Sequence, residues 1–114
     1  MRSDPIMKAI KLALEEKKAE DIIIIDVREK TPLNDYHVIC SASNQRKMAA
    51  IKEEVEKQIE HAGGKLHHIE GTPESGWILV DAFDIIVHIF SLEERDRIRL
   101  EDLFKPKKAT KAPQ

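Results

Sequence analysis

Five histidines are the first candidates for chemistry in this chain, because an imidazole can bind a transition metal or exchange a proton near neutral pH. His67 and His68 are neighbours in a segment with strand character, so we expect their side chains to point to opposite faces. His61 lies at the end of a predicted helix, and His37 and His88 belong to separate predicted strands. Their spacing matches no zinc-binding pattern. The sequence therefore predicts no metal site.

Four aspartates could hold a divalent cation for phosphoryl or nucleotidyl transfer, a reaction that needs carboxylates close to one another. Asp81 and Asp84 are separated by a predicted turn, and Asp21 and Asp26 bracket a predicted strand. Neither pair has the Asp-x-Asp spacing that places two carboxylates on one strand face. Aspartate is also common in turns and at strand ends. We predict no catalytic residue and no cofactor.

Other catalytic patterns are also missing from the sequence. Gly63-Gly64 follows a predicted helix instead of preceding one, so it does not form a phosphate-binding loop. No serine has the context of a nucleophile elbow. Cys40 is the single cysteine, which points to a reducing compartment, and its strand-like surroundings predict a buried, unreactive thiol. We expect the protein not to be an enzyme.

Trp77 is the residue that best suggests a binding surface. Aromatic residues make up only 4% of the chain, and Trp77 is its single tryptophan. A tryptophan at the start of a strand can belong to the core or act as an interface anchor, and both interpretations stay open. As an anchor among acids it would suit a basic protein partner. The acidic residues that bracket it are Glu70, Glu74, Asp81 and Asp84.

The elements that must position these residues begin with a hairpin. Residues 77–80 and 85–90 are rich in β-branched and aromatic residues, with a polar break between them. An unbroken run of isoleucines at 22–25 predicts a strand covered on both faces. Residues 36–42 predict another central strand. Residues 65–70 predict a short strand that pairs in parallel with it after a helical crossover.

Two main helices and a short final one complete the predicted fold. The first helix ends near residue 18, and Ser43 is expected to cap the second, which ends at Gly63-Gly64. Residues 71–76 should form a loop, and 100–104 a short helix or turn. The fold class is therefore α/β, a mixed sheet of about five strands flanked by helices. The second helix should bury one apolar stripe: Met48, Ile51, Val55, Ile59 and Ala62.

Length and charge bound the organisation of the chain. Its 114 residues suit one domain at 1–104 and a disordered basic tail at 105–114 with four lysines. Without these lysines, the 19 basic residues fall to 15, against 21 acidic residues. A domain with this net negative charge is unsuited to binding a nucleic-acid phosphate backbone through its main face. No apolar run could span a membrane and no targeting signal is recognisable, so we expect a cytoplasmic protein.

Several motifs stand along the chain with a specific spacing. They are Asp26-Val27-Arg28, residues 35–43, Gln45-Arg46, Glu70-Gly71, residues 76–90, Arg95 and residues 100–104. Together they cover about residues 6–104, and they resemble the ribosomal silencing factor family, also called Iojap.

The resemblance implies a nucleotidyltransferase-like fold without the transferase's catalytic carboxylates. It also implies binding to the large ribosomal subunit, through its ribosomal protein number fourteen, at the face where the small subunit docks. Such binding would block subunit joining and repress translation, and family members also assist large-subunit maturation. We further expect a contact between the lysine-rich tail and ribosomal RNA and no membrane partner, and we leave open a homodimer in the free state.

The resemblance also supplies the predicted site. The family usually has tyrosine where this chain has Ala82 and Ile98, and often tryptophan at Phe104, so each departure removes area or a polar group from the predicted interface. The alternative function is a nucleotidyltransferase or metal-dependent phosphohydrolase on the same fold. The predicted partner-binding residues are Trp77, Asp81 and Asp84, with Glu70 and Arg95 at the rim.

Overall fold

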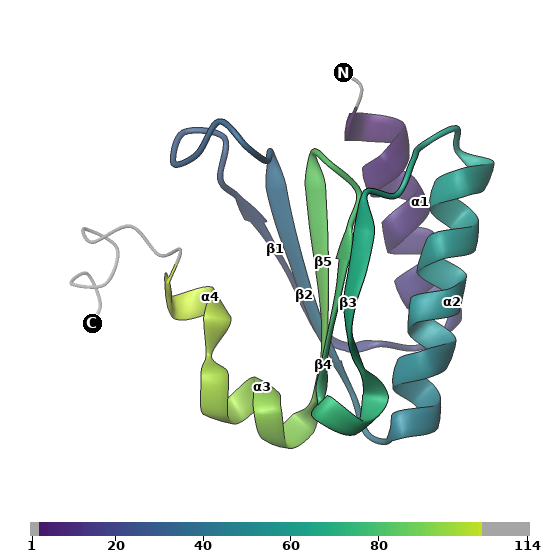
Figure 1. Ribbon diagram of the computed structural model, residues 1–114, viewed down its shortest axis with the longest axis vertical. Helices are drawn as coiled ribbons and strands as arrows, with labels where there is room; N and C mark the ends of the chain where they lie inside the picture. Colours follow the sequence, from purple (N-terminus) through teal and green to yellow (C-terminus); the bar gives the residue numbers. More distant parts are fainter. Residues whose placement is uncertain (1–2, 104–114) are drawn as a thin grey trace.

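The computed structural model describes residues 3–103 and has a five-stranded sheet at its centre. Helices α1 and α2 cover one face of the sheet, and α3 and α4 lie against part of the other (Figure 1). The strand order is β1-β2-β5-β4-β3. The elements are α1 (Ser3–Glu16), β1 (Glu20–Asp26), β2 (Tyr36–Ala42), α2 (Gln45–His61), β3 (His68–Thr72), the 3-10 helix η1 (Pro73–Ser75), β4 (Trp77–Asp81), β5 (Ile85–Ser91), α3 (Leu92–Ile98) and α4 (Leu100–Leu103).

The predicted hairpin is confirmed and supplies the middle of the sheet. Strand β5 pairs antiparallel with β4 and parallel with β2, so the sheet is mixed as expected. Residues 85–90 are all buried: α1 and α2 cover one face of β5, and on the other face α3 packs against part of the strand while the side chains of Trp77 and His37 contact His88. Strand β5 thus lies at the centre of the sheet and contributes side chains to both of its faces.

The isoleucine run forms β1, but the prediction that it is covered on both faces is wrong. β1 is an edge strand that pairs only with β2. Ile22 and Ile24 are 39% and 37% exposed, because α1 and α2 pack over β5 and its neighbours and leave the outer strand uncovered. An irregular register between Glu20 and Ile23, where Asp21 has a φ of 49°, bends this edge.

The predicted parallel pairing of the strands before and after α2 is also wrong. β2 and β3 run in the same direction, but β5 and β4 lie between them, and β2 takes β5 as its parallel partner. β3 begins at His68 instead of residue 65 and extends through Gly71 and Thr72, which were expected in a loop. Gly71 has a φ of 87° and lies against the carbonyl of Trp77, so only glycine fits there.

Helix α2 follows the predicted apolar stripe at Met48, Ile51, Val55 and Ile59, which are buried against the sheet. Ala62 was expected in the stripe but is exposed, because the helix ends at His61 and Ala62 is its C-cap. Its N-cap is Asn44 and not Ser43, because the Asn44 side chain accepts a hydrogen bond from the Lys47 N–H at 2.8 Å. Gly63, with a φ of 86°, ends the helix as expected. The predicted tail at 105–114, like Phe104, lies outside the described residues. Among the helices of residues 3–103, none has the length and apolar character to cross a membrane.

Candidate functional site

The face of the sheet opposite α1 and α2 is only partly covered. Helices α3 and α4 meet it at one end (Figure 1). There Leu100 packs against Ile39 and Phe90. The rest of this face is built from alternate residues of four strands, which the strand register brings side by side. We call this surface the open face; its members are His37, His68, Glu70, Trp77, Leu79 and Asp81, with the buried His88 of β5 at its base.

Three of the five predicted partner-binding residues therefore share one surface. Leu79 pairs across the strands with Glu70 on one side and His88 on the other, and Trp77 and Asp81 lie two residues to either side of it. Glu70 is exposed, while Trp77 and Asp81 are half-buried. The arrangement combines an apolar centre with a carboxylate at its edge, and its use by a basic partner stays a prediction.

Asp84 and Arg95 occupy different surroundings. Asp84 lies in the turn between β4 and β5, where its carbonyl accepts hydrogen bonds from the N–H groups of Asp35 (2.7 Å) and Tyr36 (3.2 Å). The sequence suggested that Arg95 lies at the rim of the interface, but its side chain is only 8% exposed. Its guanidinium donates to the Asp21 carbonyl at 2.7 Å and to Ser41 Oγ at 3.5 Å, so it ties α3 to the bend of β1. A contact between Arg95 and a partner stays a prediction.

A hydrogen-bonded chain of aromatic side chains, which sequence reasoning missed, supports the open face. Trp77 Nε1–H donates to His88 Nδ1 at 3.2 Å, and His88 Nε2 lies 2.9 Å from His37 Nδ1. Because an indole N–H can only donate, His88 Nδ1 must accept, so His88 carries its proton on Nε2 and donates it to His37. The Trp77 ring also packs on Phe90, with 4.9 Å between centroids. The indole is thus held in one orientation.

His37 and His88, the two histidines of this hydrogen-bonded series, are held in the neutral form. Burial lowers the pKa of His88 to about 3, and the nearby His37 lowers it in the same direction. Burial also lowers the pKa of His37, although the negative charge of Asp81 opposes that change. The two hydrogen bonds require neutral imidazoles, because His88 Nδ1 and His37 Nδ1 both accept.

A groove of about 530 Å³ lies beside Trp77, between the open face and α3. Trp77, Leu79 and Ile98 supply its apolar lining, and Glu70, Glu94 and Arg97 are among its polar lining residues. Ile98 therefore stands at the predicted interface. Ala82 does not, because it is buried in the core cluster on the α1 and α2 side of the sheet.

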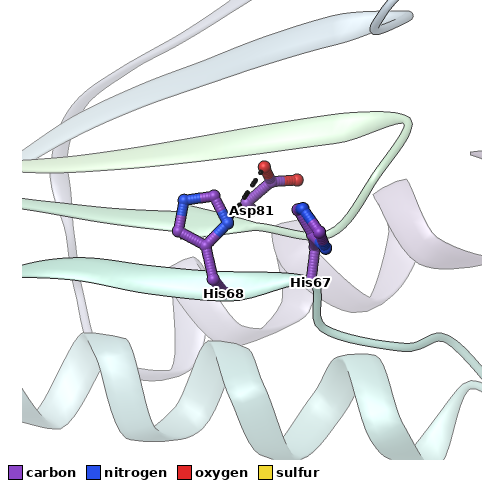
Figure 2. Close-up of side chains that lie close together, drawn as sticks. All are labelled: His67, His68 and Asp81. Atoms are coloured by element: carbon purple, nitrogen blue, oxygen red, sulfur yellow. Dashed lines mark ion pairs between the residues drawn. The ribbon is translucent and has the colours of Figure 1, made fainter.

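The expectation that His67 and His68 must point apart is wrong. His67 precedes β3 and only His68 lies within it, so the alternation of a strand does not apply to the pair. Their rings lie edge to face, 4.9 Å apart. Figure 2 shows both rings beside the carboxylate of Asp81, with His68 Nδ1 3.5 Å from Asp81 Oδ2.

The aspartates considered for catalysis do not gather into a metal site. Within residues 3–103, the one group of three or more His, Cys, Asp or Glu side chains close enough to share a metal ion is His67, His68 and Asp81. It contains a single carboxylate. Cys40 is buried as predicted, and burial raises the pKa of its thiol to about 12, which keeps it protonated and unreactive.

Known structures contain the same arrangement of helices and sheet. A crystal structure of a protein from Chromobacterium violaceum matches with a TM-score of 0.86 and 31% identity, covering 93% of this chain and 91% of that one. A crystal structure from Bacillus halodurans matches with a TM-score of 0.77 and 28% identity, covering 86% and 91%. The domain is thus an α/β fold of an established type. Its relation to the nucleotidyltransferase fold stays a prediction.

Sequence comparison identifies the family. A family model described as "Ribosomal silencing factor during starvation" matches residues 1–114. The ribosomal silencing factor RsfS of Bacillus subtilis (strain 168) is 34% identical over 104 residues, which cover 91% of this chain and 88% of that protein. The chain belongs to the ribosomal silencing factor family, and the predicted resemblance is confirmed.

A more distant relative has a name that refers to ribosome assembly. It is the mouse protein "Mitochondrial assembly of ribosomal large subunit protein 1", 29% identical over 94 residues, which cover 80% of this chain and 41% of that protein. Together these names support a ribosome-associated role in silencing or biogenesis.

Proposed function

We propose that this protein binds the large ribosomal subunit through ribosomal protein number fourteen and sterically blocks joining of the small subunit. The observation that carries the proposal is the open face, where a sheet surface with a half-buried tryptophan is left uncovered by the protein's own helices. An uncovered sheet face that presents an aromatic side chain suits a protein partner. The carboxylates of Glu70 and Asp81 give it the charge that a basic partner surface would select.

Charge reversal at Glu70 tests this proposal. Glu70 is exposed, so Glu70→Lys changes the charge of the open face at little cost in folding free energy. We expect about tenfold weaker binding to purified large subunits, measured by co-sedimentation at low and moderate salt. The matched control is Glu53→Lys, which makes the same change at an exposed position of α2, on the opposite side of the sheet. Equal binding by the two variants would move the site away from the open face.

We infer that the open face also serves a role in large-subunit maturation. A factor bound at the face where the small subunit docks could act before or after assembly of the large subunit is complete. This extension rests on the name of the mouse relative, which refers to assembly of the large ribosomal subunit. Its site of action would be the cytoplasm, where bacterial ribosomes are assembled and used.

The proposal includes no catalysis, and the alternative is an enzyme on the same fold. Phosphoryl or nucleotidyl transfer needs carboxylates that share a magnesium ion. In residues 3–103, no group of three such side chains is composed mainly of carboxylates. Calorimetry with Mg²⁺ and ATP decides between the two: we expect no binding heat, and tight binding would favour the enzyme.

A homodimer of the free protein is a further part of the proposal. Strand β1 lies at the sheet edge, and Ile22 and Ile24 are partly exposed along it. An edge with apolar side chains can pair with a second copy. Light scattering across a range of concentrations should show a dimer in equilibrium with a monomer; a monomer at every concentration would exclude it.

The four lysines of 105–114 add a proposed contact with ribosomal RNA. Because each lysine at a phosphate releases a counterion, binding by a chain without this segment should depend less steeply on salt. An unchanged salt dependence would argue against the contact.

A further inference from the structure

We propose that His67, His68 and Asp81 form a binding site for a zinc ion at the edge of the open face. The potential ligand atoms of these three side chains all lie within 4.8 Å of one another. They come from the residue before β3, the first residue of β3 and the last residue of β4 (Figure 2). Both histidines are exposed, so small rotations of their side chains could bring the three atoms to zinc-ligand distance.

The backbone around the site holds two of the ligands in place. Asp81 Oδ1 accepts the N–H of Phe83 at 2.9 Å, which leaves Oδ2 directed at His68. The N–H of His67 donates to the Asp81 carbonyl at 2.7 Å, so the two residues are joined through their backbones. The His67 ring also lies against Phe83, with 5.0 Å between centroids. The site is therefore built on paired strand ends and not on a free loop.

Glu70 supplies the second observation. Its Oε2 lies 2.9 Å from His68 Nε2, on the far side of the ring from Asp81. A neutral His68 that donates from Nε2 to Glu70 has a lone pair on Nδ1, facing the Asp81 carboxylate. In this neutral form the two lone pairs repel each other, and a cation bound between them would remove the repulsion. A carboxylate that holds the other nitrogen of a metal-bound histidine is a frequent arrangement in metal sites.

The donor set selects the type of ion. Two imidazoles and one carboxylate suit zinc, with water in the remaining position, whereas magnesium prefers oxygen ligands. The competing explanation is a protonated His68 that bridges Glu70 and Asp81 without a metal. These two explanations differ in what added zinc does.

Calorimetric titration of the full chain with ZnCl₂ near neutral pH tests the site. We expect binding with a stoichiometry of one, accompanied by a rise in melting temperature, while MgCl₂ produces neither effect. His68→Gln should abolish this binding, and His67→Gln should weaken it strongly. Glu70→Gln should weaken it by about tenfold, because Glu70 orients a ligand without being one.

His61→Gln is the matched control, since His61 is exposed at the end of α2, outside the cluster. It should bind zinc as the unmodified chain does. Absence of zinc binding, or binding that survives His68→Gln unchanged, would overturn the proposal. Because none of these measurements involves the ribosome, failure of this site would leave the proposed function untouched.

Discussion

Replacing Trp77 with alanine is expected to weaken binding to the large ribosomal subunit about thirtyfold, or about 2 kcal/mol. The indole is half-buried, fixed by its hydrogen bond to His88 and its packing on Phe90, and it lines the groove beside α3. An aromatic side chain that is already held in one orientation loses little entropy on binding. Co-sedimentation with purified large subunits measures the effect.

The structure shows that Trp77 also contributes to the core, so stability must be measured in parallel. Trp77→Phe keeps most of the ring and should retain more binding than Trp77→Ala. Leu12→Ala is the control, because Leu12 is a 52% exposed apolar residue on α1, in the layer behind the sheet. Normal binding by Trp77→Ala, together with a lower melting temperature, would limit Trp77 to a structural role.

Acid should destabilise the protein through His88. The pKa of His88 is lowered by burial to about 3, whereas the ordinary value is 6.5. The unfolded chain therefore binds a proton at a pH where the folded chain does not, and stability falls as the pH drops from about 6.5 towards 3. At about 1.4 kcal/mol per pH unit, the contribution between pH 7 and pH 4 is about 3 kcal/mol. Urea unfolding at several pH values measures it.

A variant that cannot titrate separates His88 from other groups. In His88→Gln, the amide could still accept from Trp77, and the fall in stability between pH 7 and pH 4 should be about 3 kcal/mol smaller. The titratable neighbour of His88 is His37, on which Asp81 acts in turn, and both remain in the variant. His61→Gln should show the same pH dependence as the unmodified chain. Parallel pH profiles for His88→Gln and the unmodified chain would contradict the account.

Elements could be predicted from the sequence because their signals are local. The stripe of α2 and the β-branched hairpin each follow from residue types within a few positions. Strand order is different, because it depends on which distant strands pair. The isoleucines of β1 are equally apolar in a central strand or an edge strand, and only the cover of α1 and α2 decides their exposure.

The candidate site shows the same division. Alternation along β4 places Trp77 and Asp81 on one face, and this could be read from the sequence. His37 and His88 were missed, because they are 51 residues apart and meet only through the pairing of β2 with β5. The spacing of His88 and Phe90 was the available signal, since alternation puts both on one face of β5, and the pairing of Trp77 with Phe90 makes it the face of Trp77. The inward turn of Arg95 depends on the bend in β1, which no local pattern indicates.

A subunit-joining assay tests the central claim most directly. Purified large subunits are incubated with the protein, small subunits are added, and the mixture is resolved on a sucrose gradient. We predict that the protein migrates with free large subunits and reduces the amount of joined ribosomes, that Glu53→Lys does the same, and that Glu70→Lys and Trp77→Ala require a higher concentration. Undiminished joining at a saturating concentration of the protein, or its co-migration with joined ribosomes, would contradict the account.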